Sequence, residues 1–297
     1  MSSERRPDLR IPHLPPLPTQ GDAKAKFDVA PTLAPDAVAP LANGTNPNAL
    51  YSASDAAYHL RELEEKLDRC IAAMTMHFQP IVHAKTRARY GYEALLRSTD
   101  RALPHPGAIL DAAERLEKIT TIGRAVRAQS AKVFSAAPPE RGVVFINLHL
   151  LDLMDKQLTS AFAPLSKIAS RVVLEITERT SLEGQIDLRY RVAELRELGF
   201  RIAIDDLGGG HARMGTFTLL DCDFVKLDMS LVRDVDKHPM KQRLIKSVTQ
   251  LCKEQGITLI GEGVETEAEA QVLVDLDCDL LQGYLIAKPA LPFCDAL

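Results

Sequence analysis

Two adjacent aspartates, Asp205 and Asp206, stand directly after the short apolar run 201–204 (RIAI) and directly before a run of glycines. Neighbouring carboxylates repel each other, so the pair needs a proton or a cation to neutralise it. The apolar, β-branched run predicts a buried strand, which places both acids where that strand ends. A helix N-cap followed by a turn is the competing interpretation, because Asp caps helices and Gly forms loops.

The combination of an apolar run and a polar side chain recurs along the chain. The polar residues at or near the ends of the other runs are Glu93, Asn147, Glu175, Lys226, Asp228, Glu262, Glu265 and Gln282. Any one of them could be an ordinary turn residue. Because consecutive runs each carry one, we expect these side chains to converge at one mouth of a closed sheet.

Such a mouth concentrates negative charge that protons or cations must neutralise. Its carboxylates are those of Glu93, Glu175, Asp205, Asp206 and Glu262. Asn147 adds a carbonyl oxygen, and hard oxygen ligands without His or Cys predict Mg²⁺ or Mn²⁺ rather than Zn²⁺ or Cu²⁺. Adjacent aspartates suit two metal ions about 3.5–4 Å apart, an arrangement that activates water against a phosphate ester. We therefore predict phosphate ester hydrolysis, in which Lys226 stabilises charge or orients the water and Glu262 accepts its proton.

Eight apolar runs must position these residues. They are HFQPIV, YGYEALLR, GVVFINLH, RVVLEITER, RIAIDD, DFVKLD, ITLIGEGVE and DLLQGYLIA. Segments with helical periodicity lie between several of them, at 106–133, 186–198 and 240–255. Alternation of strand and helix predicts an α/β protein with a closed TIM-like (β/α)8 barrel. An open doubly wound fold is the weaker alternative, because the sequence has neither a GxGxxG turn nor a Walker loop.

The barrel is predicted to span residues 74–297, with two segments before it. Residues 1–51 hold nine of the eighteen prolines and show no sustained periodicity, which predicts a disordered tail. The periodicity of residues 52–73 predicts an amphipathic helix, with a capping box at Ser52 and Asp55. Its apolar stripe is Leu60, Leu63, Leu67, Ile71 and Met74. We expect the helix to pack on the barrel rather than to pair with a second copy of itself.

Composition excludes several other classes of protein. The net charge of -4 gives no basic footprint for a nucleic acid polymer. The five cysteines contain no CxxC pair, so neither a disulfide framework nor a zinc site is expected. We find no signal peptide and no apolar run approaching the roughly 18 residues of a membrane span. The sequence therefore predicts a cytoplasmic protein.

The ordered motifs identify a resemblance. FQPIV, Glu93-Ala94-Leu95 followed by Leu96-Arg97, FIN, LEITE, IDDLG, VKLD, GEGVE and QGYLIAKP occur in the order found in the EAL domain family of bacterial cyclic di-GMP phosphodiesterases. The resemblance covers about residues 74 to 292 and implies a TIM-like barrel. A barrel enzyme acting on sugars or amino acids would need a carboxylate pair at glycosidase spacing or a Schiff-base lysine, for which Lys226 is the only lysine suitably placed. The ordered motifs make this alternative remote.

The resemblance also implies roles for individual residues. One metal ion would be held by Glu93, Asn147, Glu175 and Asp205. Asp205, Asp206 and Glu262 would hold or adjoin the second, and Lys226 and Gln282 would position the attacking water or the phosphate. Gln79, Arg97 and Asp228 would contact the substrate, and Glu178 and Glu265 would support loops. The implied reaction converts cyclic di-GMP to linear 5'-pGpG with Mg²⁺ or Mn²⁺ and is inhibited by Ca²⁺, in a signalling protein that dimerises through the barrel.

One loop departs from the family pattern. After the paired aspartates the family usually reads FGTGYSSL, whereas residues 207–214 read LGGGHARM. The loop loses the Thr, Ser and Tyr hydroxyls that Glu178 would brace, and His211 stands where the family has Tyr. Two hypotheses therefore remain: an active phosphodiesterase, or a weak or inactive cyclic di-GMP receptor or scaffold. A protein partner could bind through the tail.

Overall fold

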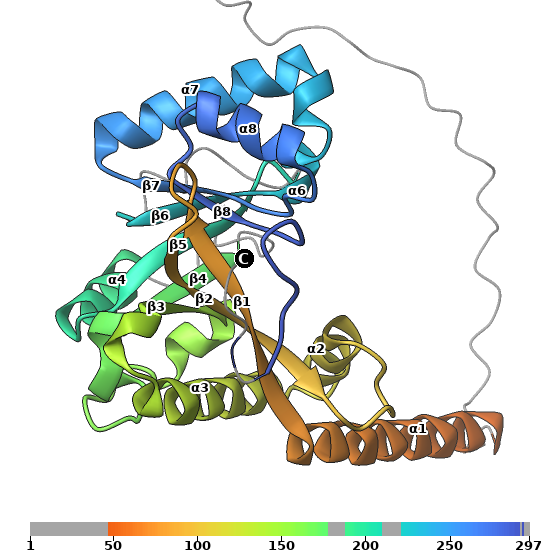
Figure 1. Ribbon diagram of the computed structural model, residues 1–297. Coiled ribbons are helices and arrows are strands. Elements are labelled where there is room, and N and C mark those ends of the chain that lie inside the picture. The colour runs from red at the N-terminus through yellow and green to blue at the C-terminus, as the bar shows by residue number, and fades with distance from the viewer. Residues whose placement is uncertain (1–46, 178–187, 210–220, 292, 294–297) are drawn as a thin grey trace, which may run out of the picture. The chain divides into compact units, whose positions relative to one another are not determined.

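The computed structural model describes residues 47–177, 188–209, 221–291 and 293 (Figure 1). Its centre is a closed barrel whose eight strands follow one another around the ring in chain order. The strands are β1 (Met74–His83), β2 (Arg89–Ser98), β3 (Val143–Leu148), β4 (Val172–Thr177), β5 (Arg201–Leu207), β6 (Phe224–Leu227), β7 (Thr258–Gly261) and β8 (Leu280–Gln282). Each apolar run of the sequence forms one of them, which confirms the predicted closed barrel.

The first strand differs from a regular (β/α)8 barrel. β1 is antiparallel to both of its neighbours, β2 and β8, whereas all other neighbouring strands are parallel. A short turn joins β1 to β2, so the predicted alternation of strand and helix begins only after β2. In this register Met74, the first residue of β1, pairs with Ser98, the last residue of β2.

Helices lie outside the barrel (Figure 1). They are α1 (Pro47–Ala72), α2 (Pro106–Arg115), α3 (Ile119–Ala136), α4 (Leu188–Glu197), α6 (Met229–Val232), α7 (Pro239–Gln255) and α8 (Glu267–Asp275), with short 3-10 turns η1 (Pro139–Arg141), η2 (Leu150–Met154), η3 (Ser166–Arg171) and η4 (Val235–Lys237). The predicted helical segments 106–133, 186–198 and 240–255 correspond to α2 with α3, α4 and α7. In the part of the chain described, no helix is both long and apolar enough to cross a membrane.

The predicted helix before the barrel is present, but it begins earlier. α1 starts at Pro47, a residue whose fixed φ suits the first turn of a helix. The capping box predicted at Ser52 and Asp55 is therefore wrong, since both residues lie within the helix. Residues 1–46 of the predicted tail lie outside the described residues.

The face that α1 turns to the barrel is narrower than the predicted stripe. Leu67 and Cys70 are buried, and Leu63 and Ile71 pack against the same core. Leu60 is exposed, and Met74 belongs to β1 instead of the helix. Lys118, just before α3, lies 2.7 Å from Glu64 and 3.1 Å from Asp68. These contacts hold α1 on the barrel, as predicted.

The interior of the barrel is an apolar layer formed by one residue from most strands. Its buried members are Ile81, Phe145, Val173, Ala203, Phe224, Ile260 and Leu280. Successive side chains of a strand point to opposite faces, so the residue two positions further along also faces the interior. For the six strands β3 to β8, the residue two positions after the apolar one is polar.

Candidate functional site

A polar layer lies directly beyond the apolar layer, at the carboxyl ends of the parallel strands. Its members are Gln79, Glu93, Asn147, Glu175, Asp205, Lys226, Glu262 and Gln282. Glu175 stands two positions after Val173, and Lys226 two after Phe224, as the period of a strand requires. The antiparallel β1 reverses this order, because Gln79 precedes Ile81 and pairs with Glu93. Every member of this layer was predicted from the sequence, and contacts between strands show that they converge.

Lys226 is the centre of the polar layer. Its ammonium lies 2.5 Å from Glu262 Oε1 and 2.6 Å from Glu175 Oε1. It also lies 3.5 Å from Glu93 Oε2 and 3.6 Å from Asp205 Oδ1. The side chain is only 1% exposed, so these four carboxylates take the place of water around its charge.

Amide side chains fix the orientation of Glu93. Asn147 Nδ2 donates to its Oε1 at 2.8 Å, and Gln282 Nε2 donates to its Oε2 at 2.6 Å. Gln282 Nε2 also lies 3.1 Å from Gln79 Oε1, while Gln79 Nε2 donates to the carbonyl of Ala287. Residues from β1, β2, β3 and β8 are thus joined in one network.

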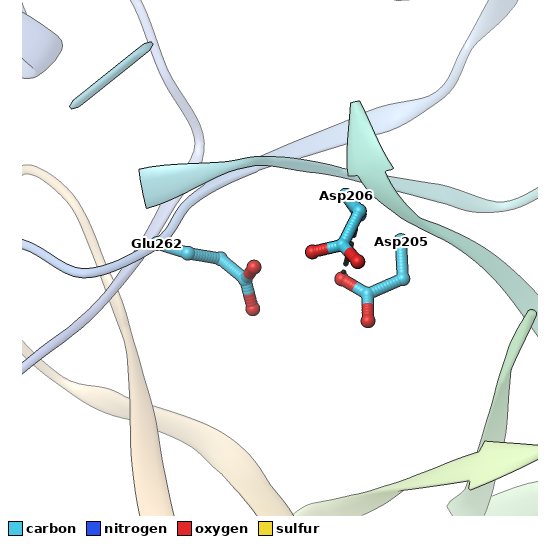
Figure 2. Close-up of side chains that lie close together, drawn as sticks. All are labelled: Asp205, Asp206 and Glu262. Carbon is cyan, nitrogen blue, oxygen red and sulfur yellow. Dashed lines mark hydrogen bonds between the residues drawn. The ribbon is translucent and has the colours of Figure 1, made fainter. Parts of the chain in front are cut away.

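A β-bulge brings Asp205 and Asp206 to the same side of the sheet. Ile204 pairs with Val225 and Leu207 with Leu227, so β5 has one residue more than β6 over this stretch. Asp206 adopts a left-handed φ of 63°, and its N–H donates to Asp205 Oδ1 at 2.9 Å. The carboxylates of Asp205, Asp206 and Glu262 each offer an oxygen within 4.8 Å of the others, and Figure 2 shows them turned toward a common space.

Burial and charge alter the acidity of these groups. Burial raises the pKa of Glu262 to about 8, although Lys226 opposes the rise. Burial likewise raises the pKa of Glu175 and of Asp205. For Glu93, the effect of burial is outweighed by Lys226 and by the hydrogen bonds from Gln282 and Asn147, so its pKa is lowered. The carboxylates raise the pKa of Lys226 well above its ordinary value despite burial, so the lysine is charged.

The oxygen atoms of the polar layer are suitable ligands for hard divalent cations. Glu175 is fully buried, and Lys226, 2.6 Å from its Oε1, is the cation that it contacts. Its Oε2 has no hydrogen-bond partner among the described residues. Three further carboxylates converge as described, and Asn147 adds an amide oxygen. The cluster contains oxygen ligands without His or Cys, as Mg²⁺, Mn²⁺ and Ca²⁺ prefer. When these carboxylates are deprotonated, their negative charge exceeds the single positive charge of Lys226, and a bound cation would compensate the rest.

The other residues predicted for the site do not belong to the polar layer. Asp228 is the N-cap of α6 and accepts from Ser230 N–H at 2.9 Å, and Glu265 forms an ion pair with Arg233. Arg97 donates to the neighbouring Leu96 carbonyl at 2.7 Å and is not among the side chains that line the pocket described next. Glu178 and His211 lie outside the described residues, as does most of the divergent 207–214 loop.

An open pocket of about 270 Å³ lies above the polar layer. Gln79, Glu93, Asp206, Glu262 and Gln282 contribute to its floor. Its walls add residues that sequence reasoning missed: Leu95, Met229, Arg233 and Tyr284. Tyr284 follows the QG pair of β8 directly and was within reach of a motif argument. Met229 and Arg233 lie on and just after α6, beyond a strand end, where no pattern in the sequence marked them.

The sequence and the fold both resemble known proteins. Residues 60–289 match the family model described as EAL domain. The curated relative "Probable cyclic di-GMP phosphodiesterase PdeA" of Escherichia coli is 33% identical over 148 residues, which cover 48% of this chain and 20% of that protein. The bifunctional diguanylate cyclase/cyclic di-GMP phosphodiesterase MucR of Pseudomonas aeruginosa is 27% identical over 239 residues, covering 77% of this chain and 35% of MucR.

A solved structure with the same fold is BlrP1 of Klebsiella pneumoniae in complex with calcium and cyclic di-GMP. It has a TM-score of 0.67 and 28% identity and covers 73% of this chain and 56% of BlrP1. A manganese and cyclic di-GMP complex of BlrP1 has a TM-score of 0.65. The chain spans only a fifth to about a third of the length of the two curated relatives it is compared with here.

Proposed function

The chain belongs to the EAL domain family, and on that premise we propose that it is a metal-dependent phosphodiesterase that hydrolyses cyclic di-GMP to linear 5'-pGpG. The observation that carries the proposal is the convergence of Asp205 with Asp206 and Glu262, two residues that line an open pocket, next to the buried Lys226. The site combines cation ligands with groups able to move a proton.

We assign the cation ligands to two overlapping sets. Glu93, Asn147, Glu175 and Asp205 would hold one divalent cation, Mg²⁺ or Mn²⁺. Asp205, Asp206 and Glu262 would hold or adjoin the second. When bound, such cations favour deprotonation of water and offset negative charge on the phosphate. Asn147 and Gln282 hold the carboxylate of Glu93 in a fixed orientation through their hydrogen bonds.

Lys226, Glu262 and Gln282 would assist the reaction itself. Water attacks the phosphorus of one phosphodiester and gives up a proton, the bond to the 3' oxygen breaks, and that oxygen takes up a proton and leaves as a hydroxyl. Glu262 would accept the proton of the attacking water, because its carboxylate lines the pocket and lies beside those of Asp205 and Asp206. Lys226, only 2.5 Å away, would stabilise the charge that develops on the phosphate oxygens. Gln282, beside Glu93, would position the water or the phosphate.

Substrate contacts are proposed for residues that line the pocket. Gln79 in the floor and Asp228 on the wall would bind the substrate. Arg97 would reach a phosphate only after leaving the Leu96 carbonyl to which it donates. Glu265, and Glu178 outside the described residues, would support the adjoining loops. A homodimer through the barrel, a protein partner of the tail and inhibition by Ca²⁺ belong to the same proposal.

A second candidate function is a cyclic di-GMP receptor or scaffold without turnover. It is favoured by the sequence LGGGHARM at 207–214, which lacks the hydroxyl residues usual in the family. The presence of every carboxylate named above favours the enzyme, because loss of activity would be expected to affect a cation ligand.

One assay separates the two functions. Purified protein is incubated with cyclic di-GMP and Mg²⁺ or Mn²⁺, and the products are resolved by chromatography beside a Glu93→Ala variant. Conversion to pGpG that is lost in the variant supports the enzyme. Binding in Ca²⁺ without conversion in Mn²⁺ supports the receptor, and neither binding nor conversion refutes both.

A further inference from the structure

Arg233 is the only cationic side chain on the pocket wall among the described residues. The wall and floor also carry five carboxylates: Glu93, Asp206, Asp228, Glu262 and Glu265. Lys226 is fully buried beneath them and is engaged by the acids of the polar layer. Among the described residues that line the pocket, Arg233 is therefore the one positive charge available to an anionic group that lies away from the polar layer.

The guanidinium of Arg233 is held in a fixed direction by Glu265. Arg233 Nη2 donates to Glu265 Oε1, and its Nη1 contacts Oε2 of the same carboxylate. An end-on fork of this kind uses one hydrogen on each terminal nitrogen. The Nε–H and the two outer N–H groups have no partner among the described residues. The ion pair therefore orients Arg233 and leaves it donors for a ligand.

A single buried carboxylate fastens the backbone on both sides of this ion pair. Glu269, which is 2% exposed, accepts from Asp234 N–H through Oε1 and from Glu265 N–H through Oε2, both at 2.9 Å. Asp234 directly follows Arg233. In addition, Lys241 Nζ donates to the carbonyl of Arg233 at 2.6 Å. Arg233 and Glu265 are thus positioned before any ligand arrives, which lowers the entropy lost on binding.

We propose that Arg233 binds the phosphate of cyclic di-GMP that is not being hydrolysed, with Glu265 and Glu269 as its positioning residues; the inference rests on the proposed function. Cyclic di-GMP has two phosphates, and the carboxylate cluster with its cations accounts for one. The other would face an acidic wall without Arg233. A planar guanidinium binds phosphate oxygens in pairs, and a lysine does not reproduce that geometry.

The first experiment measures binding and turnover separately. Variants Arg233→Ala and Arg233→Lys are compared with Arg191→Ala as a matched control. The side chain of Arg191 is 31% exposed, against 32% for Arg233, and it pairs with Glu194. Binding of cyclic di-GMP is titrated calorimetrically in Ca²⁺, and KM and kcat are measured in Mn²⁺. We expect Arg233→Ala to raise Kd and KM about tenfold or more with a smaller change in kcat, Arg233→Lys to be intermediate, and Arg191→Ala to stay within about twofold of wild type.

A substrate with one phosphate tests which group Arg233 contacts. Bis(p-nitrophenyl) phosphate offers only the phosphate that reacts. We expect the fall in kcat/KM caused by Arg233→Ala to be about tenfold greater for cyclic di-GMP than for this ester. An equal loss on both substrates would assign Arg233 a general effect on the site and overturn the inference.

The positioning role of Glu269 is tested by a double-mutant cycle. Glu269→Gln removes the charge that three backbone N–H groups share, including that of Thr266. If Glu269 acts through Arg233, Glu269→Gln alone raises the KM for cyclic di-GMP. In the Arg233→Ala variant the same substitution adds little further increase in KM. Additive effects on KM would overturn this part of the inference, whatever the change in thermal stability.

The outcomes distinguish this inference from the proposed function. Normal hydrolysis with equal Kd in Arg233→Ala and Arg191→Ala would overturn the role of Arg233 and leave the phosphodiesterase intact. Binding in Ca²⁺ that depends on Arg233, without turnover, would support the inference while refuting the enzyme. Wild-type protein that neither binds nor hydrolyses cyclic di-GMP would refute both.

Discussion

The ammonium of Lys226 lies 2.5 Å from the carboxylate of Glu262, at the point where acids from four strands meet. A buried charge of one sign is stable only when opposite charge surrounds it, and here the acids outnumber the lysine. The balance between Lys226, these acids and divalent cations therefore determines how stable the barrel is and how well it binds metal.

Replacing Lys226 with Met should destabilise the metal-free protein. The change leaves Glu93, Glu175 and Glu262 buried without their cation, which lowers the free energy of unfolding by about 3 kcal/mol or more. Urea denaturation in EDTA measures this loss. Mn²⁺ should reduce it, because a bound cation compensates the same carboxylates.

The control for this prediction is Lys253→Met. Lys253 pairs with Asp277 at 2.9 Å, but both side chains are about half exposed, so the change should cost less than about 1 kcal/mol. Equal stability of wild type and Lys226→Met in EDTA would contradict the account of the polar layer.

Asp206→Asn should weaken divalent cation binding. Asn tolerates the left-handed backbone that Asp206 adopts, so the substitution removes charge with little added strain. We expect the Kd for Mn²⁺ to rise about tenfold or more, a loss of about 1.4 kcal/mol, in a calorimetric titration. Asp277→Asn is the surface control. Unchanged Mn²⁺ affinity in Asp206→Asn would remove Asp206 from the cation site.

Asp155 should make the stability of the protein sensitive to acid. Its buried carboxylate accepts from Arg124 at 2.8 and 2.9 Å and from Arg127 at 2.6 Å. The hydrogen bonds from Arg124 lower its pKa in spite of burial. A lowered folded-state pKa gives stability that is complete above the unfolded value of about 3.9 and is lost as the pH falls through the folded value.

Asp155→Asn tests that dependence. Near pH 7 the variant should be less stable by about 1.5–3 kcal/mol, because hydrogen bonds between charged groups are lost. The difference from wild type should shrink below about pH 4, where protonation removes the same charge. Asp152→Asn is an informative companion, since burial raises the pKa of Asp152 despite its contact with Arg127. A stability difference that is constant from pH 7 to pH 3 would contradict the assignment.

The described thiols should react slowly with alkylating reagents. Burial raises the pKa of Cys222 to about 11 and that of Cys252 and Cys278 to about 12, and Cys70 is also buried. At pH 8 the thiols of Cys222, Cys252 and Cys278 are protonated, whereas the reactive form is the thiolate, and all four cysteines are shielded by burial. When native protein is treated with DTNB, none of these four thiols should react in a fast phase. Cys294 lies outside the described residues, and unfolded protein should release five equivalents of thionitrobenzoate, one for each cysteine. Fast modification in a Cys294→Ser variant would contradict this.

Much of the barrel and its polar layer could be predicted, because each strand leaves a local signature. A short apolar run such as 201–204 specifies a buried strand, and period-two alternation then fixes which polar residue faces inward. Glu175 and Lys226 were predicted because they stand at or near the ends of such runs, and the alternation explains why both face inward. The order of the motifs identified the family resemblance and the residue roles that it implies. One of these residues, Arg97, was assigned to the substrate, but its side chain donates to the carbonyl of its neighbour Leu96.

Other features depend on relationships that are not local in the sequence. The antiparallel direction of β1 follows from a short turn and a pairing, and neither changes the apolar pattern of the strand. The left-handed φ of Asp206 arises from register against β6. Arg233 was missed because its significance comes from Glu265 and Glu269, more than thirty residues away in the chain.

The reversal of β1 also determines where α1 is attached. Because Met74 pairs with Ser98, the N-terminal helix joins the barrel at the rim where the parallel strands end. Ser98 Oγ donates to the carbonyl of Cys70, and Thr99 N–H donates to that of Ala73, which fastens α1 to the end of β2. The end of α1 is therefore attached directly to β2, the strand that carries Glu93. A displacement of α1 would therefore act on the barrel at the rim that carries the polar layer.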